Sequence, residues 1–191
     1  MTEVVPLIAA AAEVDRVLRE ERIAYCIIGG LAVYRWGEPR FTQDVDFSVL
    51  CPVGEVPVVL ARLAGRLAPR FPDSEAFARQ SFVYLARSAG GLPIDIALGA
   101  SEYEHRCIGR ATPVEFAPGT ALVTCSAEDL VVQKMFAARP SDLVDVAGVL
   151  VRCAGKLDWK LIDRELGPLA ETRDDVDILA ELERIRRRAG S

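Results

Sequence analysis

The sequence predicts an α/β (α+β) fold, a mixed sheet flanked by helices, with a C-terminal helical subdomain. Short apolar segments that end at glycine or proline alternate with helical patterns up to about residue 125, and helical patterns dominate beyond it. The chain has 191 residues, 51% of them hydrophobic, which is enough for one ordinary domain with a small appendage. We place the α/β core at residues 1–120 and the helical subdomain, packed on that core, at residues 121–191.

The N-terminal half shows two kinds of apolar spacing. Apolar residues recur every three or four positions where we expect helices, and short apolar or alternating runs next to glycine or proline indicate strands. The expected elements are a helix over 6–21, a strand over 23–28, a short helix over 31–36 that begins directly after two glycines, a strand over 44–50 and a helix over 56–67.

Two further strands are expected at 82–87 and 93–98, since both segments alternate and a loop with two glycines joins them as a hairpin. A short helix over 101–109 and a short strand over 114–116 follow. These segments complete the predicted sheet.

The C-terminal part is helical throughout. Ser126 begins a capping-box pattern in front of an apolar helix. Pro140 separates this helix from the next, which Ser141 is expected to cap. Two more helices are predicted over 158–167 and 174–188.

The charge and the cysteines exclude several classes of function. Lysine and arginine number 23 against 28 aspartates and glutamates, and this net charge of −5 argues against a protein that coats nucleic acid. The five cysteines lack metal-ligand spacing and the chain has one histidine, so we expect buried free thiols rather than a zinc site. The N-terminus lacks the basic start of a signal peptide, and no apolar run is long enough for a bilayer. We therefore expect a cytoplasmic protein without membrane contact.

The strongest chemical signal is the pair Asp44 and Asp46 on one predicted strand. Strand periodicity places both carboxylates on the same face, where two anions repel unless a cation compensates. Hard oxygen ligands in this arrangement favour Mg²⁺ or Mn²⁺. Taken alone, the pair also fits a solvated strand face. Asp95 has a similar setting, opposite the apolar side chains of its strand, and if the two strands are neighbours, three carboxylates converge in a site for two-metal phosphoryl transfer.

Gly29 and Gly30 follow a predicted strand and open a helix. Glycines allow a close approach of the backbone to phosphate, and a helix N-terminus offers N–H groups to an anion. The pattern is neither a P-loop nor a dinucleotide fingerprint, and a plain turn is the structural alternative.

Together these segments resemble the nucleotidyltransferase superfamily of polymerase-β type, in which a strand, a Gly-Gly or Gly-Ser turn, a helix and an Asp-x-Asp strand follow one another. The segment from Arg40 through Thr42 to Asp46 has the form Arg-x-Thr-x-Asp-x-Asp, which is similar to the motif of the AbiEii-like toxin branch and its uncharacterised relatives. A second stretch, Ser126 to Asp145, resembles the downstream signature of that branch. These stretches and the Asp95 strand cover under half of the chain.

The resemblance implies a nucleotidyltransferase-like fold and a transfer of a nucleoside monophosphate from a nucleoside triphosphate (NTP) to an acceptor hydroxyl. Asp44, Asp46 and Asp95 would hold Mg²⁺ or Mn²⁺ and act in catalysis, with Asp95 as the base. The residues implied in nucleotide binding are Gly29, Gly30, Arg40, Thr42, Lys134 and Asp145.

Each flanking residue keeps a structural alternative. Lys134 fits a surface lysine whose stem packs on apolar neighbours, and Arg40 and Thr42 fit a strand cap. Asp145, together with Asp142 on the same helix face, fits a salt bridge to an arginine such as Arg139.

Two other functions remain open on the sequence alone. The first is a catalytically silent module of the same fold that binds nucleotide or neutralises a toxin, with a cognate toxin or antitoxin as partner. The second is a metal-dependent phosphotransferase or phosphohydrolase, which release of phosphate rather than pyrophosphate would reveal. The acceptor, whether tRNA, protein or small molecule, is left open.

Overall fold

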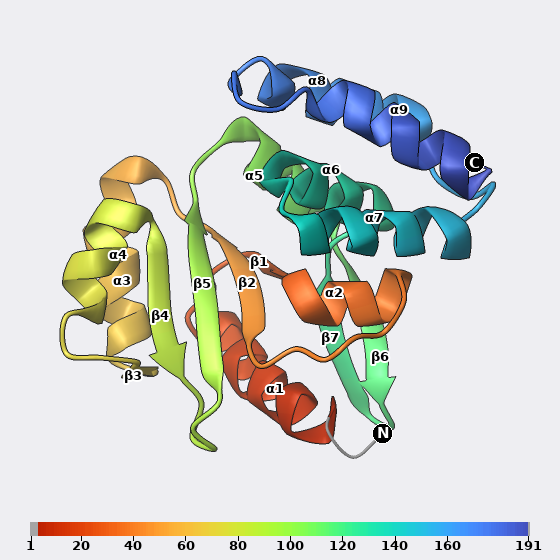
Figure 1. Ribbon diagram of the computed structural model, residues 1–191. Coiled ribbons are helices and arrows are strands. Elements are labelled where there is room, and N and C mark those ends of the chain that lie inside the picture. Colours follow the sequence, from red (N-terminus) through yellow and green to blue (C-terminus); the bar gives the residue numbers. More distant parts are fainter. Residues whose placement is uncertain (1–3, 191) are drawn as a thin grey trace. The chain divides into compact units, whose positions relative to one another are not determined.

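The computed structural model describes residues 4–190 of the chain (Figure 1). Seven strands in this part of the chain form one mixed sheet. The sheet confirms the predicted fold class. In the order in which they lie side by side, the strands are β3 (Ala68–Pro69), β4 (Val83–Arg87), β5 (Pro93–Gly99), β2 (Val45–Leu50), β1 (Tyr25–Ile28), β7 (Thr120–Thr124) and β6 (Thr112–Ala117).

Pairing within the sheet is parallel at two inner positions and antiparallel elsewhere. β2 runs parallel to β5, with Asp46 directly opposite Asp95, and β1 runs parallel to β7. β1 is antiparallel to β2, and the outer pairs β3–β4, β4–β5 and β6–β7 are antiparallel. The strand bearing Asp95 is therefore the neighbour of the strand bearing Asp46, which is the condition on which the predicted convergence of three carboxylates depended.

The two faces of the sheet have different chemistry. On one face, Val45, Phe47 and Val49 are fully buried in an apolar cluster with residues of α1 and α3. On the opposite face, Cys26 of β1 lies 4.0 Å from Cys107 of α5, measured between the two sulfurs. Since side chains alternate along a strand, the even-numbered residues of β2 point to this second face. The helices of this part are α1 (Val4–Glu20), α3 (Val56–Ala64) with a preceding 3₁₀ turn (Val53–Glu55), α4 (Ser74–Ser81) and α5 (Glu102–Arg110).

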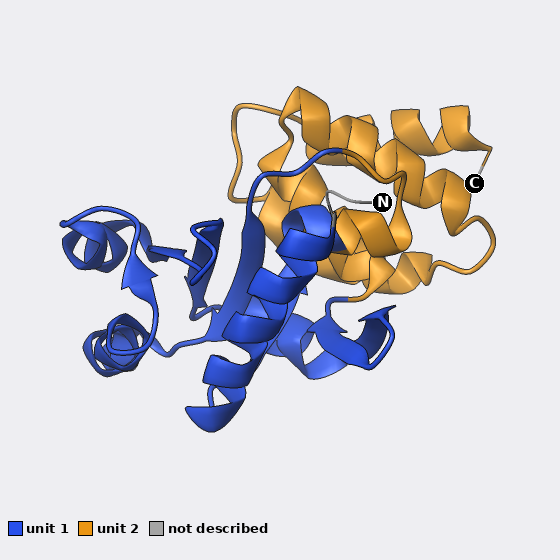
Figure 2. Ribbon diagram, turned by 90° about the horizontal axis from the view of Figure 1, so that it is seen from below, with its two compact units in different colours: residues 1–31, 41–125 blue, residues 32–40, 126–191 orange. Residues whose placement is uncertain are grey.

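The chain divides into two compact units, shown in different colours in Figure 2. Unit 1 comprises the residues up to Leu31 and Phe41–Cys125. Unit 2 comprises Ala32–Arg40 and the residues from Ser126 onward. Toward the C-terminus the units change between Cys125 and Ser126, and Ala32–Arg40 belongs to the helical unit. The predicted division into domains after residue 120 stays a prediction.

Unit 2 is a helical assembly held by packing and by backbone contacts. The end of α2 joins it because Arg152 donates a hydrogen bond to the carbonyl oxygen of Gly37 (2.6 Å). A Cβ on Gly148 would lie 3.1 Å from the backbone nitrogen of Glu38, so any other residue there would require the Glu38 backbone to shift by a few tenths of an ångström. The helices are α2 (Gly29–Trp36), whose first turn belongs to unit 1, α6 (Ala127–Ala137), α7 (Pro140–Arg152), α8 (Trp159–Ala170) and α9 (Ile178–Ala189).

Several predicted boundaries were wrong in detail. The helix expected after the glycines begins at Gly29 itself, and Asp44 lies in a bend just before β2 rather than on the strand. Ser126 caps α6 as predicted, by accepting a hydrogen bond from the N–H of Asp129 (3.0 Å). Ser141 does not cap α7, because Pro140 occupies the first helical position and Arg139 precedes it as N-cap.

Some elements had no clear sequence signal. α4, β3 and β7 were not predicted, and the expected strand over 114–116 is the middle of the longer β6. Among residues 4–190, no helix combines the length and the apolar character that a membrane crossing requires.

Candidate metal and nucleotide site

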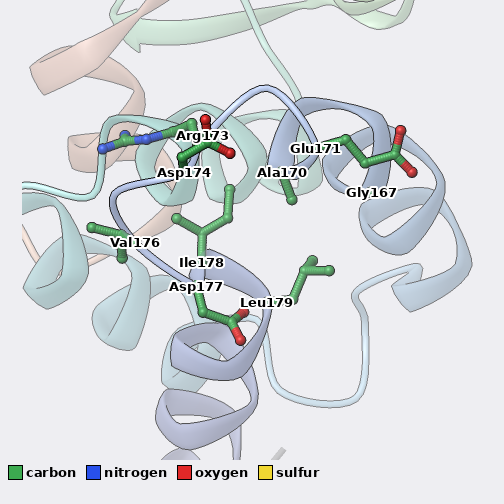
Figure 3. A pocket seen from close by; sticks show the side chains of 9 residues that line it. All are labelled: Gly167, Ala170, Glu171, Arg173, Asp174, Val176, Asp177, Ile178 and Leu179. Carbon is green, nitrogen blue, oxygen red and sulfur yellow. The ribbon is translucent and has the colours of Figure 1, made fainter.

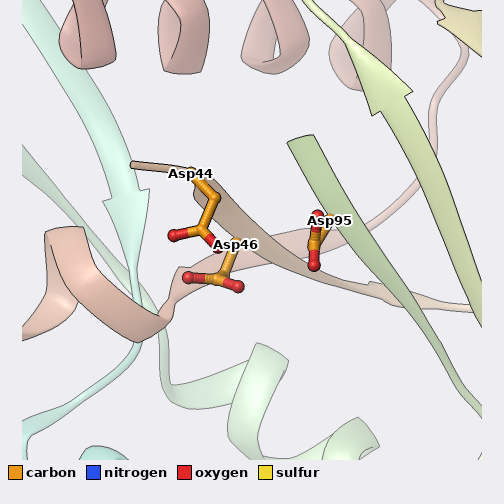
Figure 4. Close-up of side chains that lie close together, drawn as sticks. All are labelled: Asp44, Asp46 and Asp95. Atoms are coloured by element: carbon orange, nitrogen blue, oxygen red, sulfur yellow. The ribbon is translucent and has the colours of Figure 1, made fainter. Parts of the chain in front are cut away.

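Three carboxylates converge on the face of the sheet opposite the main apolar cluster. Asp44, Asp46 and Asp95 each place one oxygen within 4.8 Å of the others, and all three side chains are half-buried (Figure 4). The cluster unites residues that are 51 positions apart in the sequence. It brings together the three side chains that the sequence singled out as metal ligands.

Strand register explains two of these positions and the bend explains the third. Asp46 and Asp95 are register partners on parallel strands, so their side chains leave the sheet on the same side. The flanking Ile94 and Ile96 are fully buried on the other face, which fixes the orientation of Asp95. Asp44 reaches the cluster from the bend before β2, where Thr42 donates a hydrogen bond to its Oδ1 (2.9 Å).

Gly29 lies in direct contact with the cluster. Its φ of +58° is in the left-handed region, and a Cβ built there would lie 2.0 Å from Oδ2 of Asp46. Both facts require glycine, one through backbone strain and one through space. The next N–H, that of Gly30, donates to the same Asp46 oxygen at 3.4 Å. The first turn of α2 therefore approaches the acidic cluster with its backbone.

Gly30 has a second close neighbour in Thr42. A Cβ on Gly30 would lie 2.5 Å from the Thr42 hydroxyl oxygen, the same oxygen that donates to Asp44. The two glycines thus allow the helix start, the Thr42 hydroxyl and two aspartates to share a small volume. The sequence predicted all of these residues for the site, although it assigned the glycines to phosphate rather than to this packing.

Arg70 is a site residue that the sequence reasoning missed. Its guanidinium pairs with Oδ1 of Asp95 and donates to the carbonyl oxygen of Ile94 (3.0 Å). It lies directly after the two-residue strand β3, in a segment with no recognisable motif. Only the position of β3 at the edge of the sheet brings it to β5.

The donor set fits a hard divalent cation. Three carboxylate oxygens within 4.8 Å of one another match the all-oxygen coordination of Mg²⁺ or Mn²⁺, which complete their shells with water and phosphate oxygens. The half-buried position leaves room for such ligands. The absence of thiol or imidazole from this set argues against a zinc preference.

A second charged cluster lies within unit 2. The Lys134 ammonium contacts Asp142 (2.7 Å) and Asp145 (2.9 Å), and these carboxylates have 0% and 2% side-chain exposure. Arg40 binds Asp145 through two hydrogen bonds of 2.7 and 2.9 Å, and Arg139 binds Asp142. The salt-bridge alternative considered for Asp142 and Asp145 is thus present. Nucleotide binding by Arg40, Lys134 and Asp145 stays a prediction.

Ionisation of the two buried aspartates depends on these cations. Burial opposes the charged form of Asp142, but hydrogen bonds from Arg139 and Lys134 outweigh it and keep its pKa below the ordinary value. Asp145 behaves in the same way, since burial is outweighed by Arg40 and Lys134 and its pKa is also lowered. Both groups therefore stay ionised in the folded protein at neutral pH.

A shallow pocket of about 430 Å³ lies elsewhere in unit 2, around the turn between α8 and α9 (Figure 3). Its lining mixes apolar side chains such as Ile178 with the charged Glu171 and Asp177. The Asp177 carboxylate is engaged as the N-cap of α9, accepting from the N–H of Ala180 (2.9 Å). None of the predicted site residues lines this pocket.

The fold is that of nucleotidyltransferase-like proteins. An antigenic nucleotidyltransferase-like protein from Paracoccidioides brasiliensis matches with a TM-score of 0.51 and 17% identity, over 93% of this chain and 92% of that chain. The solution structure of the antibiotic-resistance factor ANT(2'')-Ia matches with a TM-score of 0.48 and 12% identity, over 96% of this chain and 91% of that chain. The crystal structure of ANT(2'')-Ia with adenylyl-2''-tobramycin matches with a TM-score of 0.41 and 17% identity, over 98% of this chain and 99% of that chain. No family model and no curated protein matches the sequence.

Proposed function

We propose that the protein is a metal-dependent nucleotidyltransferase, which moves a nucleoside monophosphate from an NTP to an acceptor hydroxyl. The observation that carries this proposal is the convergence of Asp44, Asp46 and Asp95 within 4.8 Å, next to the first turn of α2. The nucleotidyltransferase-like fold supports the same class of reaction. A binding role alone would not need three carboxylates, which repel one another, at one point of the sheet.

Asp44, Asp46 and Asp95 would hold Mg²⁺ or Mn²⁺, which supplies positive charge to the phosphate oxygens as negative charge develops on the leaving pyrophosphate. The chain itself provides the remaining functions. Asp95 accepts the proton of the attacking hydroxyl. A bond forms between the acceptor oxygen and the α-phosphorus, and the bond between the α-phosphorus and the bridging oxygen breaks.

The first turn of α2 binds the triphosphate. Backbone N–H groups at a helix N-terminus favour anions, and Gly29 and Gly30 let these groups come close to a ligand. Thr42, which donates to Asp44, orients that carboxylate toward the cluster. Lys134, whose two described ion pairs occupy two of its three N–H donors, is the phosphate contact that the family resemblance implies.

The proposal extends to the biological setting, for which the motif resemblance is the support. The similarity of the segment Arg40–Asp46 and of the stretch Ser126–Asp145 to AbiEii-like proteins supports a role in a toxin–antitoxin system, with a cognate partner protein. In such a role we expect a macromolecular acceptor, tRNA or protein. Location in the cytoplasm belongs to the same proposal.

The test is transfer of label from α-³²P-labelled NTPs. Each NTP is incubated with the protein, Mg²⁺ and cell extract, and RNA, protein and small molecules are separated while pyrophosphate and phosphate are measured. The Asp46→Asn variant preserves the shape of the side chain and removes its charge. Asp73→Asn is the matched control, because Asp73 is exposed before α4 and makes no capping hydrogen bond. We expect labelling by the wild type and the control, and its loss in Asp46→Asn.

Other outcomes separate the alternatives. Equal labelling by Asp46→Asn would refute the assignment of the site. Release of phosphate without labelled product would favour a phosphotransferase or phosphohydrolase. Nucleotide binding without release of either product would favour the silent module.

A further inference from the structure

Arg70 reaches the candidate metal site from the edge of the sheet. Its backbone N–H donates to the carbonyl oxygen of Leu85 (2.9 Å), which anchors the residue next to β4. Its side chain extends to β5, where Nη2 donates to the carbonyl oxygen of Ile94 (3.0 Å) and to Oδ1 of Asp95. Nε lies 3.4 Å from the carbonyl oxygen of Ala86. The guanidinium is therefore fixed by the backbone of two strands as well as by the carboxylate.

This arrangement restricts Asp95 more than its exposure would suggest. The Asp95 side chain is 30% exposed and that of Arg70 is 23% exposed, so solvent alone would leave the carboxylate free to rotate. A planar guanidinium held at two carbonyl groups is a rigid partner, and binding Oδ1 sets the direction of Oδ2. Removal of a group that orients a metal ligand in this way commonly lowers metal affinity or activity by about tenfold to a hundredfold.

We propose that Arg70 is a positioning residue, which holds Asp95 in the orientation that completes the three-carboxylate site. This inference rests on the proposed function, since it takes the cluster to be a metal site. Arg70 acts through Asp95. Its positive charge by itself would weaken the binding of a cation, so the sign of a substitution's effect separates orientation from charge.

The experiment measures Mn²⁺ affinity of the full chain by electron paramagnetic resonance, without nucleotide. Arg70→Gln removes the charge and the planar fork, and Arg70→Lys keeps the charge but removes the fork. We expect both variants to bind Mn²⁺ about tenfold more weakly than the wild type. Circular dichroism verifies folding, and Arg70→Lys provides the comparison if Arg70→Gln does not fold.

A double-mutant cycle and a charge control sharpen the test. In an Asp95→Asn background, Arg70→Gln is expected to cause no further loss of Mn²⁺ affinity, because the group through which Arg70 acts is already altered. Arg87→Gln is the matched control, because this substitution changes the net charge by the same amount as Arg70→Gln. Arg87 ends β4 and donates a hydrogen bond to the carbonyl oxygen of Gly91 (3.2 Å). We expect its Mn²⁺ affinity to remain within about twofold of the wild type.

Each other result overturns the inference. Unchanged or tighter Mn²⁺ binding by folded Arg70 variants would show that orientation by Arg70 does not matter. A further loss in the Asp95→Asn background would show that Arg70 acts elsewhere. If the wild type binds Mn²⁺ and the Arg70 variants bind it equally well, the inference about Arg70 fails but the proposed function survives. If the wild type does not bind Mn²⁺ at the cluster, both fail together.

Discussion

Replacement of Gly29 by alanine tests the packing that brings the helix start to the acidic cluster. The alanine Cβ would lie 2.0 Å from Oδ2, 2.5 Å from Cγ and 2.8 Å from Cβ of Asp46. Three atoms of one short side chain are involved, including the Cβ nearest its backbone, so a change of rotamer alone does not clear the space. Either the first turn of α2 or β2 itself must shift.

The magnitude follows from two separable costs. A non-glycine residue at φ +58° costs about 1–2 kcal/mol of conformational strain. Overpacking against Asp46 adds about 1–3 kcal/mol. Gly91→Ala is the matched control, because Gly91 has a similar φ of +81° and nothing lies within 4 Å of its added Cβ. The difference between the two variants therefore isolates the contact with Asp46.

The assay combines urea unfolding with Mn²⁺ titration. We expect Gly29→Ala to lose about 1–3 kcal/mol more unfolding free energy than Gly91→Ala. We also expect it to bind Mn²⁺ at least about tenfold more weakly, whereas Gly91→Ala keeps the wild-type affinity. Equal stability and equal Mn²⁺ affinity of the two variants would refute the close approach of Gly29 to Asp46.

The charged cluster of unit 2 and the thiols give further tests. Lys134→Met is expected to lower the unfolding free energy at pH 7 by about 3 kcal/mol in urea titrations, because Asp142 and Asp145 lose a buried cation while each keeps an arginine. Both carboxyl pKa values are lowered by folding, so this stabilisation is complete above the unfolded pKa of about 4 and is lost as the pH falls through the lower folded values. A difference from wild type that does not shrink as the pH is lowered from about 4 would contradict this. Burial raises the thiol pKa of Cys51 and Cys153, and we expect both to react with Ellman's reagent no faster than the protein unfolds.

Local sequence patterns were sufficient for the centre of the sheet. The alternation around Asp46 and around Asp95 predicted which side chains leave the apolar face, and the structure makes the two residues register partners. Such patterns succeed because burial on one face dictates strand register. The same reasoning failed for Asp44, which it placed on the strand although it lies in the bend before β2. The carboxylate reaches the cluster all the same, because the Thr42 hydroxyl binds it.

Contacts between distant segments could not be predicted. Arg70 precedes Asp95 by 25 positions, and the segment around it has neither a periodic pattern nor a motif. α4 was missed because its eight residues contain few apolar side chains, with buried contacts at Ser74 and Ala78 only. The pairing of Arg40 with Asp145 spans 105 positions and depends on how the end of α2 packs within unit 2. In each case a tertiary contact decides the role of a residue whose local sequence is uninformative.

Contacts between distant segments also make two pairs of aspartates differ in the folded protein, although each pair is closely spaced in the sequence. The pairs are Asp44 with Asp46 and Asp142 with Asp145. Asp142 and Asp145 are buried and bind the ammonium of Lys134, and each also binds an arginine, so the chain itself provides their counter-charge. Asp44 is half-buried and accepts from a neutral hydroxyl, which provides no such charge. A buried carboxylate that already has two cationic partners gains little from a divalent ion, whereas a half-buried one with a neutral partner gains much. Added Mg²⁺ should therefore act on the cluster of Asp44, and substitutions at Asp145 should act through stability.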